Sequence, residues 1–439
     1  MHSASPTNLK VDEIQAARDG IHTLNRTTWP IIVIPGILAS RIRKLGSDEK
    51  IWDPDATMFM LGLMTRSPDS LARLFDPTIT PGEVIPEPHK KKRRDPAWIA
   101  RGWGGPAWDF YGDGIQALQD EFGSQGGVVY AFGYDWRLSN RVNGQKLLDY
   151  INQQVQPNHL YKPIVLSHSM GGLVTRAACC LGGESRIAAV IHTFMPTYGT
   201  PEAYTKYRLG ESDTALSQII GGNHDEISII GSGVGGLFQL LPNHIYPSSE
   251  SWLAWDSRLE TVADPGPYSL AKPYAIYRES TGRLGLVDHQ RFSANVIMIR
   301  NGEVATNTSR RLRRILDNLS EAEILHTQLL RDYCHPYTWL LAGWGLETVT
   351  AARLEFKQEV AYDVPLKPEA IVNRVIGQGD KTVAFSSASA LRGKSGYKDG
   401  AVIADVEHSK MFNNDTAIAV MKRQIRQVRN NVPISQQRA

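Results

Sequence analysis

The sequence predicts an α/β fold, with a mostly parallel sheet covered by helices on both faces and an inserted helical cap. Continuous apolar runs such as Ile31–Ile34 and Ile164–Leu166 are typical of strands that are buried on both faces. These runs alternate with segments of helical spacing, such as Gly112–Phe122. Such alternation predicts parallel strands joined by crossover helices.

Composition limits the classes of protein to which the chain can belong. Its 439 residues, 42% hydrophobic and 21% charged, are typical of a globular protein with one domain and large insertions, or with two domains. A net charge of +3 is too small to indicate a nucleic-acid partner. Three cysteines, of which Cys179 and Cys180 are adjacent, give neither a disulfide framework nor a metal-binding spacing. Because no phosphate-binding or dinucleotide-binding motif occurs either, we expect no cofactor and no metal.

The apolar and basic segments of the sequence indicate how the protein could interact with a membrane. The first residues contain no apolar segment of a signal peptide, and no run of about 18 apolar residues occurs. We therefore expect a cytoplasmic protein, or one exported by a route that needs no signal peptide. The longest apolar stretches, Met58–Met64 and Tyr337–Leu346, are too short to cross a bilayer. The basic runs Lys90–Arg94 and Arg310–Arg314 fit either solvated surfaces or a patch for lipid phosphates.

The segment Tyr161–Cys180 has the pattern of a strand, a sharp turn and a helix, with Ser169 at the turn. Such an elbow strains its central residue and needs small neighbours, which Ser167 and Gly171 provide. Ser169 is therefore the candidate nucleophile, near the positive end of the following helix dipole. The alternative is a structural turn rich in glycine.

A serine hydroxyl needs an imidazole to take its proton, and His408 is the candidate base. It follows the last predicted strand and lies 28 residues after an acidic residue, Asp380 (408 − 380 = 28). His168 is next to the serine and should point into the core, and His326 should lie in the cap.

Asp380 is the candidate acid, because it ends a predicted strand at a Gly-Gln-Gly turn. It would accept the second imidazole N–H and fix the tautomer. Asp405 and Asp332 are rivals for this role. Asp135 is expected to be structural, paired with Arg137 or a neighbouring loop.

Seven segments between about residues 29 and 425 together resemble the lecithin:cholesterol acyltransferase-like family of α/β-hydrolases, in particular its bacterial lipase-type members. The segments are PIIVIPGILASRI, GYDWRL, SHSMGG, MPTYGTP, GGLFQLLPN, GQGDKTV and EHSKMFNND. The resemblance implies a triad of Ser169, Asp380 and His408 that acts on lipid acyl esters. The cysteine-bridged lid of the animal enzymes has no counterpart here, which argues against specificity of the lipoprotein type.

Enzymes of this class use two backbone N–H groups as an oxyanion hole. The residue after the nucleophile, Met170, supplies one. The other is expected from the loop after the first strand, with Leu38 as the candidate and Ile37 as the next. Taken alone, this loop could equally be a simple strand exit.

The α/β pattern is interrupted twice, at about residues 51–107 and again at residues 201–367, and the second interruption predicts the cap. Its glycine-rich part, residues 219–237, suggests a mobile lid, and its tryptophans Trp252, Trp255, Trp339 and Trp344 fit either an apolar lid face or ordinary core. The sheet should resume at Ala370–Ile376. The predicted parts are an N-terminal arm (1–27), a core (28–200) with an insertion (about 51–107), a cap or lid (201–367) and the rest of the core (368–439).

The expected reaction passes through an acyl-Ser169 intermediate. Release by water would make the protein a lipase or phospholipase A, which the resemblance favours, and release by an alcohol would make it an O-acyltransferase. An antibacterial lipase effector of a contact-dependent secretion system is a further alternative, with an immunity protein as partner. A binding module without catalysis is the last alternative. The expected partners are a lipid acyl-ester substrate and, transiently, a membrane surface.

Overall fold

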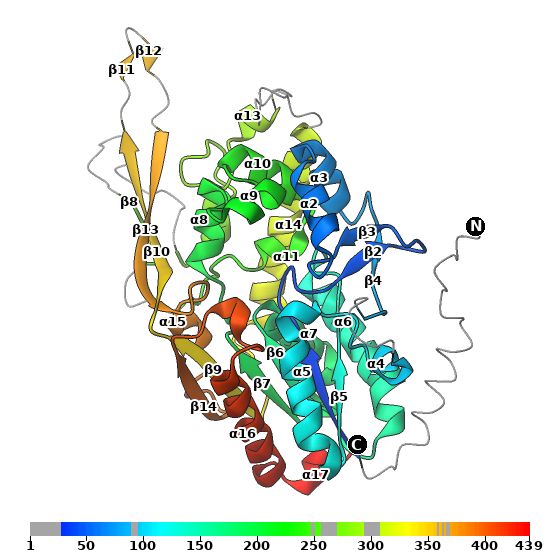
Figure 1. Cartoon of the computed structure of the whole chain (residues 1–439). Coiled ribbons are helices and arrows are strands. Elements are labelled where there is room, and N and C mark those ends of the chain that lie inside the picture. Colours follow the sequence, from blue (N-terminus) through cyan, green and yellow to red (C-terminus); the bar gives the residue numbers. More distant parts are fainter. Residues whose placement is uncertain are drawn as a thin grey trace, which may run out of the picture.

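The computed structural model describes residues 28–88, 95–246, 251–255, 270–293, 308–357, 360–361, 364–365 and 369–439 (Figure 1). The predicted N-terminal arm and the basic run Lys90–Arg94 lie outside the described residues.

Six parallel strands form the central sheet, in the order β14-β9-β7-β6-β1-β5. Ile32 of β1 aligns with Tyr130 of β5 on one side and with Val165 of β6 on the other. The predicted fold class is therefore confirmed. The strands are β1 (Trp29–Ile34), β5 (Gly127–Ala131), β6 (Ile164–His168), β7 (Ala189–Thr193), β9 (Thr338–Trp344) and β14 (Tyr397–Ala404).

Helices cover both faces of this sheet. Successive side chains of a strand point to opposite faces, so each strand contributes to the core on both sides. Ile31 and Val33 pack in the core that contains residues of α5 (Trp108–Phe122) and α16 (Asp415–Asn431). Ile32 and Ile34 belong to the core that contains residues of α6 (Asn140–Tyr150) and α7 (Met170–Ala178). The four side chains are fully buried, and each such burial stabilises the fold by about 1.5–3 kcal/mol.

Two strands differ from the sequence prediction. Ala370–Ile376 lies in β13 (Glu369–Gly379), but this strand pairs with β10 (Leu346–Lys357) in a separate sheet. The strand that extends the central sheet is β9, which lies within the range predicted as cap. Its side chains are buried up to Gly343, whereas Ile376 of β13 is 51% exposed. Continuous burial of this kind is what a central parallel strand requires.

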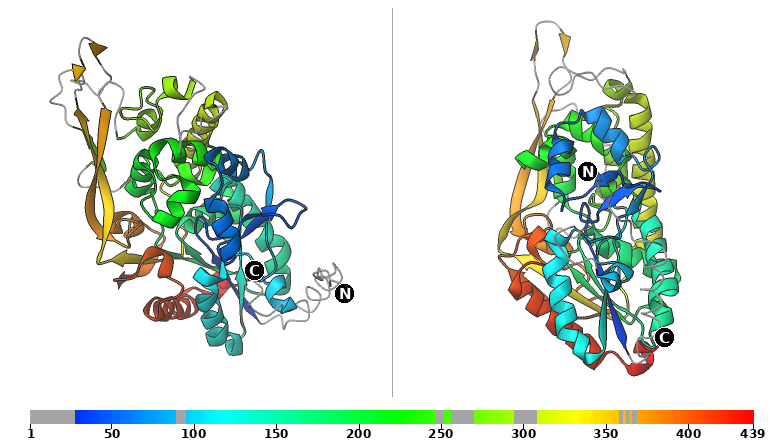
Figure 2. Two further views of the ribbon diagram at one scale, coloured as in Figure 1. Left: turned by 45° about the horizontal axis from the view of Figure 1, so that its top comes forward. Right: turned by 45° about the vertical axis from the view of Figure 1, so that its right-hand side comes forward.

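Helices from two separate insertions form the cap over the sheet (Figures 1 and 2). In the first insertion, α2 (Thr57–Met64) contacts α9 (Thr214–Ile220), and α3 (Pro68–Phe75) contacts α10 (His224–Ile230) of the second. The cap is completed by α8 (Pro201–Leu209), the 3-10 turn η6 (Gly231–Gly233), α11 (Gly235–Phe238), α12 (Pro273–Tyr277), α13 (His289–Ser293) and α14 (Thr308–Ile324).

Two three-stranded sheets account for most of the remaining strands. A three-stranded sheet contains β2 (Ile42–Lys44), β3 (Lys50–Trp52) and β4 (Gly82–Val84), and a second joins β8 (Leu253–Trp255) to β10 and β13. The long ribbon of β10 and β13 projects beside the cap (Figure 1). The others are β11 (Val360–Ala361), β12 (Val364–Pro365), α4 (Pro96–Ala100), α15 (Phe385–Ala388) and α17 (Ile434–Gln437). In the described part of the chain, no helix has the length and apolar character that a membrane span needs.

Candidate active site

Ser169 lies at a strained elbow between β6 and α7. Its φ of 53° and ψ of −130° fall in a region that residues with a side chain rarely adopt. Its own N–H donates to the carbonyl of Thr193 at 2.9 Å, which ties the elbow to the neighbouring strand. A Cβ at Gly171 would come within 2.5 Å of the carbonyl oxygen of Pro35, so this position requires glycine.

The other small neighbour of the elbow, Ser167, is fully buried. Its hydroxyl lies 2.7 Å from Nδ1 of His192 on the adjacent strand. Burial lowers the pKa of His192 to about 3, so this ring is neutral and can share a proton with the hydroxyl. A serine therefore fits a position that commonly holds glycine, because its polar atom has a partner.

The structure brings Ser169, His408 and Asp380 together from three distant segments. Nε2 of His408 is 2.8 Å from Oγ of Ser169, and Nδ1 of His408 is 2.8 Å from Oδ2 of Asp380. The backbone N–H of His408 also donates to the carbonyl of Asp380 at 2.9 Å. Nε2 is therefore placed to accept the proton of the hydroxyl, while Nδ1–H can donate to the carboxylate, as the chemistry of a serine triad requires.

Asp380 is fully buried and is held by more than the imidazole. Its Oδ1 accepts the backbone N–H groups of Thr382 at 3.0 Å and Val383 at 2.7 Å. Gly343, at the end of β9, leaves room for it, because a Cβ there would lie 2.6 Å from the Cβ of Asp380. These contacts leave Oδ2 to face the histidine.

The rival acids lie elsewhere. Asp405 is exposed, and Asp332 pairs with the ammonium of Lys394 at the surface. Asp135 forms a buried ion pair with Arg137, with 2.7 Å between Oδ2 and Nη2, so its predicted structural role is confirmed.

Three aromatic side chains hold the loop after β1, which contains the predicted oxyanion-hole residue Leu38. Trp52 donates its indole N–H to the carbonyl of Leu38 at 2.6 Å, and Tyr134 donates its hydroxyl to the carbonyl of Pro35 at 2.9 Å. The hydroxyl of Tyr111 accepts the N–H of Gly36 at 2.9 Å. Leu38 itself has a positive φ of 61°.

The N–H groups of Leu38 and Met170 donate to no protein acceptor in the hydrogen-bond network of the described residues. Leu38 lines the cavity that contains Ser169, while Met170 begins α7 directly behind it. Donors that are fixed before substrate binds are what an oxyanion hole needs. Both residues remain candidates for that role.

His168 is buried, as expected, and its ring also lies beside that of the candidate base, His408. Its ring centroid is 4.8 Å from that of His408, and its Nδ1 is 2.5 Å from the hydroxyl of Tyr111. Burial lowers the pKa of His168 well below its ordinary value, with the charge of His408 as a second cause. A neutral ring at this position adds no repulsion when His408 takes up a proton.

Ser169 and His408 open into a cavity of about 520 Å³. This volume falls within the range of sites that bind small molecules, about 300–1,000 Å³. Two cap helices contribute to it, through Met60 of α2 and Leu216 of α9. Its lining is largely apolar and includes Ile37, Leu38, Ala39, Trp52, Pro54, Phe110, Pro196, Leu240 and Val383.

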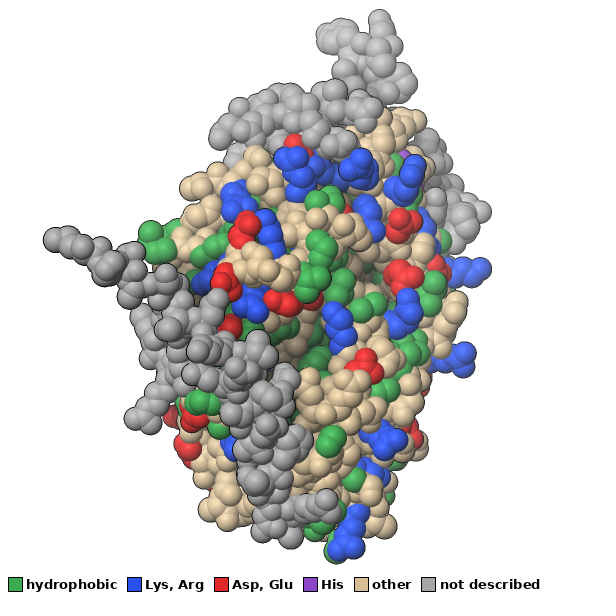
Figure 3. Space-filling view, turned by 90° about the vertical axis from the view of Figure 1, so that its right-hand side faces the viewer, with side chains coloured by type: hydrophobic (Ala, Val, Ile, Leu, Met, Phe, Trp, Pro, Cys, Tyr) green, Lys and Arg blue, Asp and Glu red, His purple; other side chains and the backbone are tan. Residues whose placement is uncertain are grey.

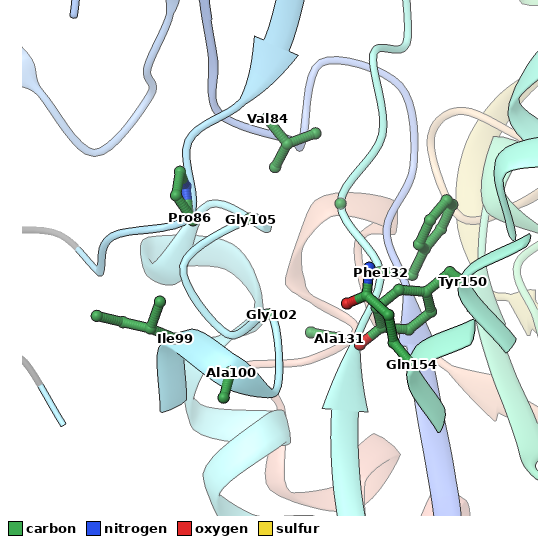
Figure 4. A pocket seen from close by; sticks show the side chains of 11 residues that line it. Val84, Pro86, Ile99, Ala100, Gly102, Gly105, Ala131, Phe132, Tyr150 and Gln154 are labelled. Atoms are coloured by element: carbon green, nitrogen blue, oxygen red, sulfur yellow. The ribbon is translucent and has the colours of Figure 1, made fainter. Parts of the chain in front are cut away.

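A second cavity, of about 300 Å³, lies near the ends of β4 and β5, and Ser169, His408 and Asp380 do not line it (Figure 4). Apolar side chains such as Val84, Ile99 and Phe132 line it, and Tyr150 and Gln154 supply polar side chains. Among the described residues, no group of three or more His, Cys, Asp or Glu side chains could hold a metal ion.

Sequence reasoning missed the residues that support the site. Trp52 and Tyr111 come from segments that carry no motif, so nothing in the sequence pointed to them. Tyr134 lies in the GYDWRL segment, but only Asp135 and Arg137 of that segment were interpreted. Gly343 lies in the apolar stretch that was assigned to the cap.

A family model for lecithin:cholesterol acyltransferase matches residues 103–257. Over this segment the chain matches that family. The segment contains Ser169 and four of the seven motifs, and it ends before Asp380 and His408. The resemblance that the motifs predict is thus confirmed. No curated protein gives a significant match to the chain.

Among solved structures, a chain in the crystal structure of a Tle4-Tli4 complex is similar, with a TM-score of 0.68 at 19% sequence identity. The similarity covers 93% of this chain and 100% of that chain, so the two share their fold almost throughout. This protein has an α/β-hydrolase-type fold. Together with the family match, the fold supports an esterase, lipase or acyltransferase that acts on lipid acyl esters.

Proposed function

We propose that this protein is a serine acyl-ester hydrolase of the lipase or phospholipase A type, with Ser169 as nucleophile, His408 as base and Asp380 as acid. The two contacts of 2.8 Å that link these residues carry the proposal. Ser169 and His408 line a largely apolar cavity, which suits an acyl chain better than a charged substrate.

In the first half of the reaction, Oγ of Ser169 attacks the acyl carbonyl carbon while its proton passes to Nε2 of His408. Asp380 accepts the Nδ1–H and stabilises the imidazolium. The N–H groups of Leu38 and Met170 donate hydrogen bonds to the carbonyl oxygen and stabilise its developing negative charge. The bond to the leaving alcohol then breaks, and His408 returns the proton to that oxygen.

In the second half, water attacks the acyl-Ser169 ester. His408 takes the proton of the water and passes it to Oγ of Ser169, so that a fatty acid leaves and the enzyme is regenerated. His168 stays neutral beside His408 throughout both halves, because its burial opposes protonation.

The nucleophile is tested with Ser169→Ala and with a fluorophosphonate probe. We expect hydrolysis of a p-nitrophenyl acyl ester to fall by about 10⁴-fold or more, as in other enzymes with a serine triad. The circular dichroism spectrum should not change. The probe should label the peptide that contains Ser169, and His408→Gln should suppress the labelling. Labelling of a different serine, or normal turnover by Ser169→Ala, contradicts the proposal.

An O-acyltransferase uses the same intermediate, and the match to an acyltransferase family favours this second candidate. Mass spectrometry of the products formed from a phospholipid, with and without an added alcohol or sterol, separates the two. We expect free fatty acid as the main product in both conditions. A new ester that replaces the fatty acid when alcohol is added assigns the transferase activity.

An antibacterial lipase effector with an immunity protein is the third candidate. It is supported by the similarity to a chain from a complex of two different proteins. Expression in the periplasm of a bacterium, with and without a gene adjacent to that of this protein, tests it. Toxicity that needs Ser169 and is relieved by the adjacent gene product would support the proposal, and growth unaffected by the active protein would refute it.

A further inference from the structure

Two sequence features without a role in the proposed reaction meet in one small cavity. These are the basic run Arg310–Arg314 at the start of α14 and the glycine-rich turn η6 that follows α10. Helix α3 closes the third side. The cavity has a volume of about 190 Å³ and is lined by Ala72, Arg73, Asp76, Ile79, Ser232, Arg310, Arg311 and Arg314.

Arg311 is only 8% exposed, although it is an arginine. One of its terminal nitrogens, Nη2, donates to the carboxylate of Asp69. The other, Nη1, is buried and has no hydrogen-bond partner among the described residues. Leaving a buried charged donor unsatisfied is costly, so the side chain indicates an acceptor that the described residues do not supply.

Positive charge exceeds negative charge around the cavity, with four arginines and a single carboxylate, Asp76, among the lining residues. Oδ1 of Asp76 already accepts the N–H of Thr78 at 2.9 Å and Nη2 of Arg314 at 3.2 Å. No carboxylate of the described residues forms an ion pair with Arg73 or Arg310. Asp69, which Arg311 contacts, and Asp76 together therefore neutralise only part of the cluster of four arginines.

The position of the arginines along α14 adds to the positive potential. This helix has 17 residues and begins at Thr308, so Arg310 and Arg311 lie in its first turn. The positive end of the helix dipole lies there and favours an anion, not a cation. Figure 3 shows Lys and Arg side chains gathered at the upper end of the face that it displays.

We propose that this cavity is an accessory binding site for a phosphate group. Guanidinium groups bind phosphate oxygens in pairs, and the first turn of α14 adds a favourable dipole. The volume is below the range of about 300–1,000 Å³ that organic ligands need, which suits a small anion or a lipid headgroup phosphate. None of the lining residues lines the Ser169 cavity, so the site is independent of the proposed reaction.

Arg310→Gln is the test variant, and Arg313→Gln is its matched control. Both arginines are exposed residues of the same helix, and only Arg310 lines the cavity. Inorganic phosphate is titrated calorimetrically into the full-length protein at constant ionic strength. We expect saturable binding that Arg310→Gln weakens about tenfold, because it removes a charge-assisted hydrogen bond. Arg313→Gln should stay within about twofold of the parent protein. Thermal unfolding checks that each variant is folded.

A vesicle arm distinguishes a lipid phosphate from a free one. Vesicles of phosphatidylcholine, with and without phosphatidic acid, are sedimented with protein that carries Ser169→Ala, which prevents lipid cleavage. Recruitment by phosphatidic acid that is lost in Arg310→Gln and kept in Arg313→Gln assigns the site to a lipid headgroup. Saturable phosphate binding without such recruitment assigns it to a soluble phosphate. Neither saturable phosphate binding nor recruitment, or equal losses in the two variants, overturns the proposal.

Discussion

Asp380→Asn isolates the contribution of the acid to the proposed reaction. The amide oxygen of an asparagine can still accept the N–H groups of Thr382 and Val383. Its NH₂ group then takes the place of Oδ2 beside His408 and donates to Nδ1. This forces the proton of the ring onto Nε2, which can no longer accept the proton of Ser169.

The wrong tautomer should lower kcat by about 10⁴-fold, the loss known for this change in an enzyme with a serine triad. That ratio corresponds to about 5 kcal/mol of lost transition-state stabilisation. Asp405→Asn is the matched control, because it makes the same change at an exposed rival acid. Steady-state hydrolysis of a short p-nitrophenyl ester measures both variants, and circular dichroism checks their folding. A loss below about tenfold for Asp380→Asn, or equal losses in the two variants, would refute the assignment.

Three further outcomes follow from the geometry. Trp52→Phe removes the 2.6 Å hydrogen bond to the carbonyl of Leu38, so kcat should fall about tenfold with an unchanged circular dichroism spectrum. Gly343→Ala places a Cβ 2.6 Å from that of Asp380, so activity should fall at least about tenfold, and normal activity would contradict the packing. Burial lowers the pKa of His159 to about 4, so between about pH 6.5 and 4 the unfolded chain binds a proton that the folded chain does not. This histidine should therefore lower the free energy of unfolding by about 2 kcal/mol at about pH 5, and urea unfolding that is no easier at pH 5 than at pH 7 would contradict this.

The candidate site could be predicted from the sequence because its chemistry requires particular residues at particular turns. Ser169 needs small residues two positions before and two positions after it, and Asp380 and His408 each follow a strand. These are local constraints, so they leave a local pattern even when the three side chains meet from distant segments. The exact order of the residues along the chain then limits the choice further, since it excludes Asp135 as the acid.

The partners of the strands could not be predicted in the same way. An apolar run indicates that a strand is buried, but it does not indicate which strand lies beside it. The stretch around Trp339 was therefore assigned to the cap, although it contains a central strand. Ala370–Ile376 was assigned to the central sheet, although it pairs in a ribbon beside the cap. Contacts between segments far apart in the sequence determine the pairing of both strands, and a local sequence pattern does not predict such contacts.

The cap shows how such long-range contacts shape the candidate site. Met60 and Leu216, which border the Ser169 cavity, come from helices about 156 residues apart (216 − 60 = 156), and those helices contact each other. Neither helix alone indicates a binding cavity, because each lines only part of it. Met58 of α2 is 81% exposed while Met60 of the same helix lines the cavity, so one short helix faces both solvent and the proposed acyl site. The specificity for an acyl chain should therefore depend on the pairing of α2 with α9 more than on the three residues that are proposed to carry out the reaction.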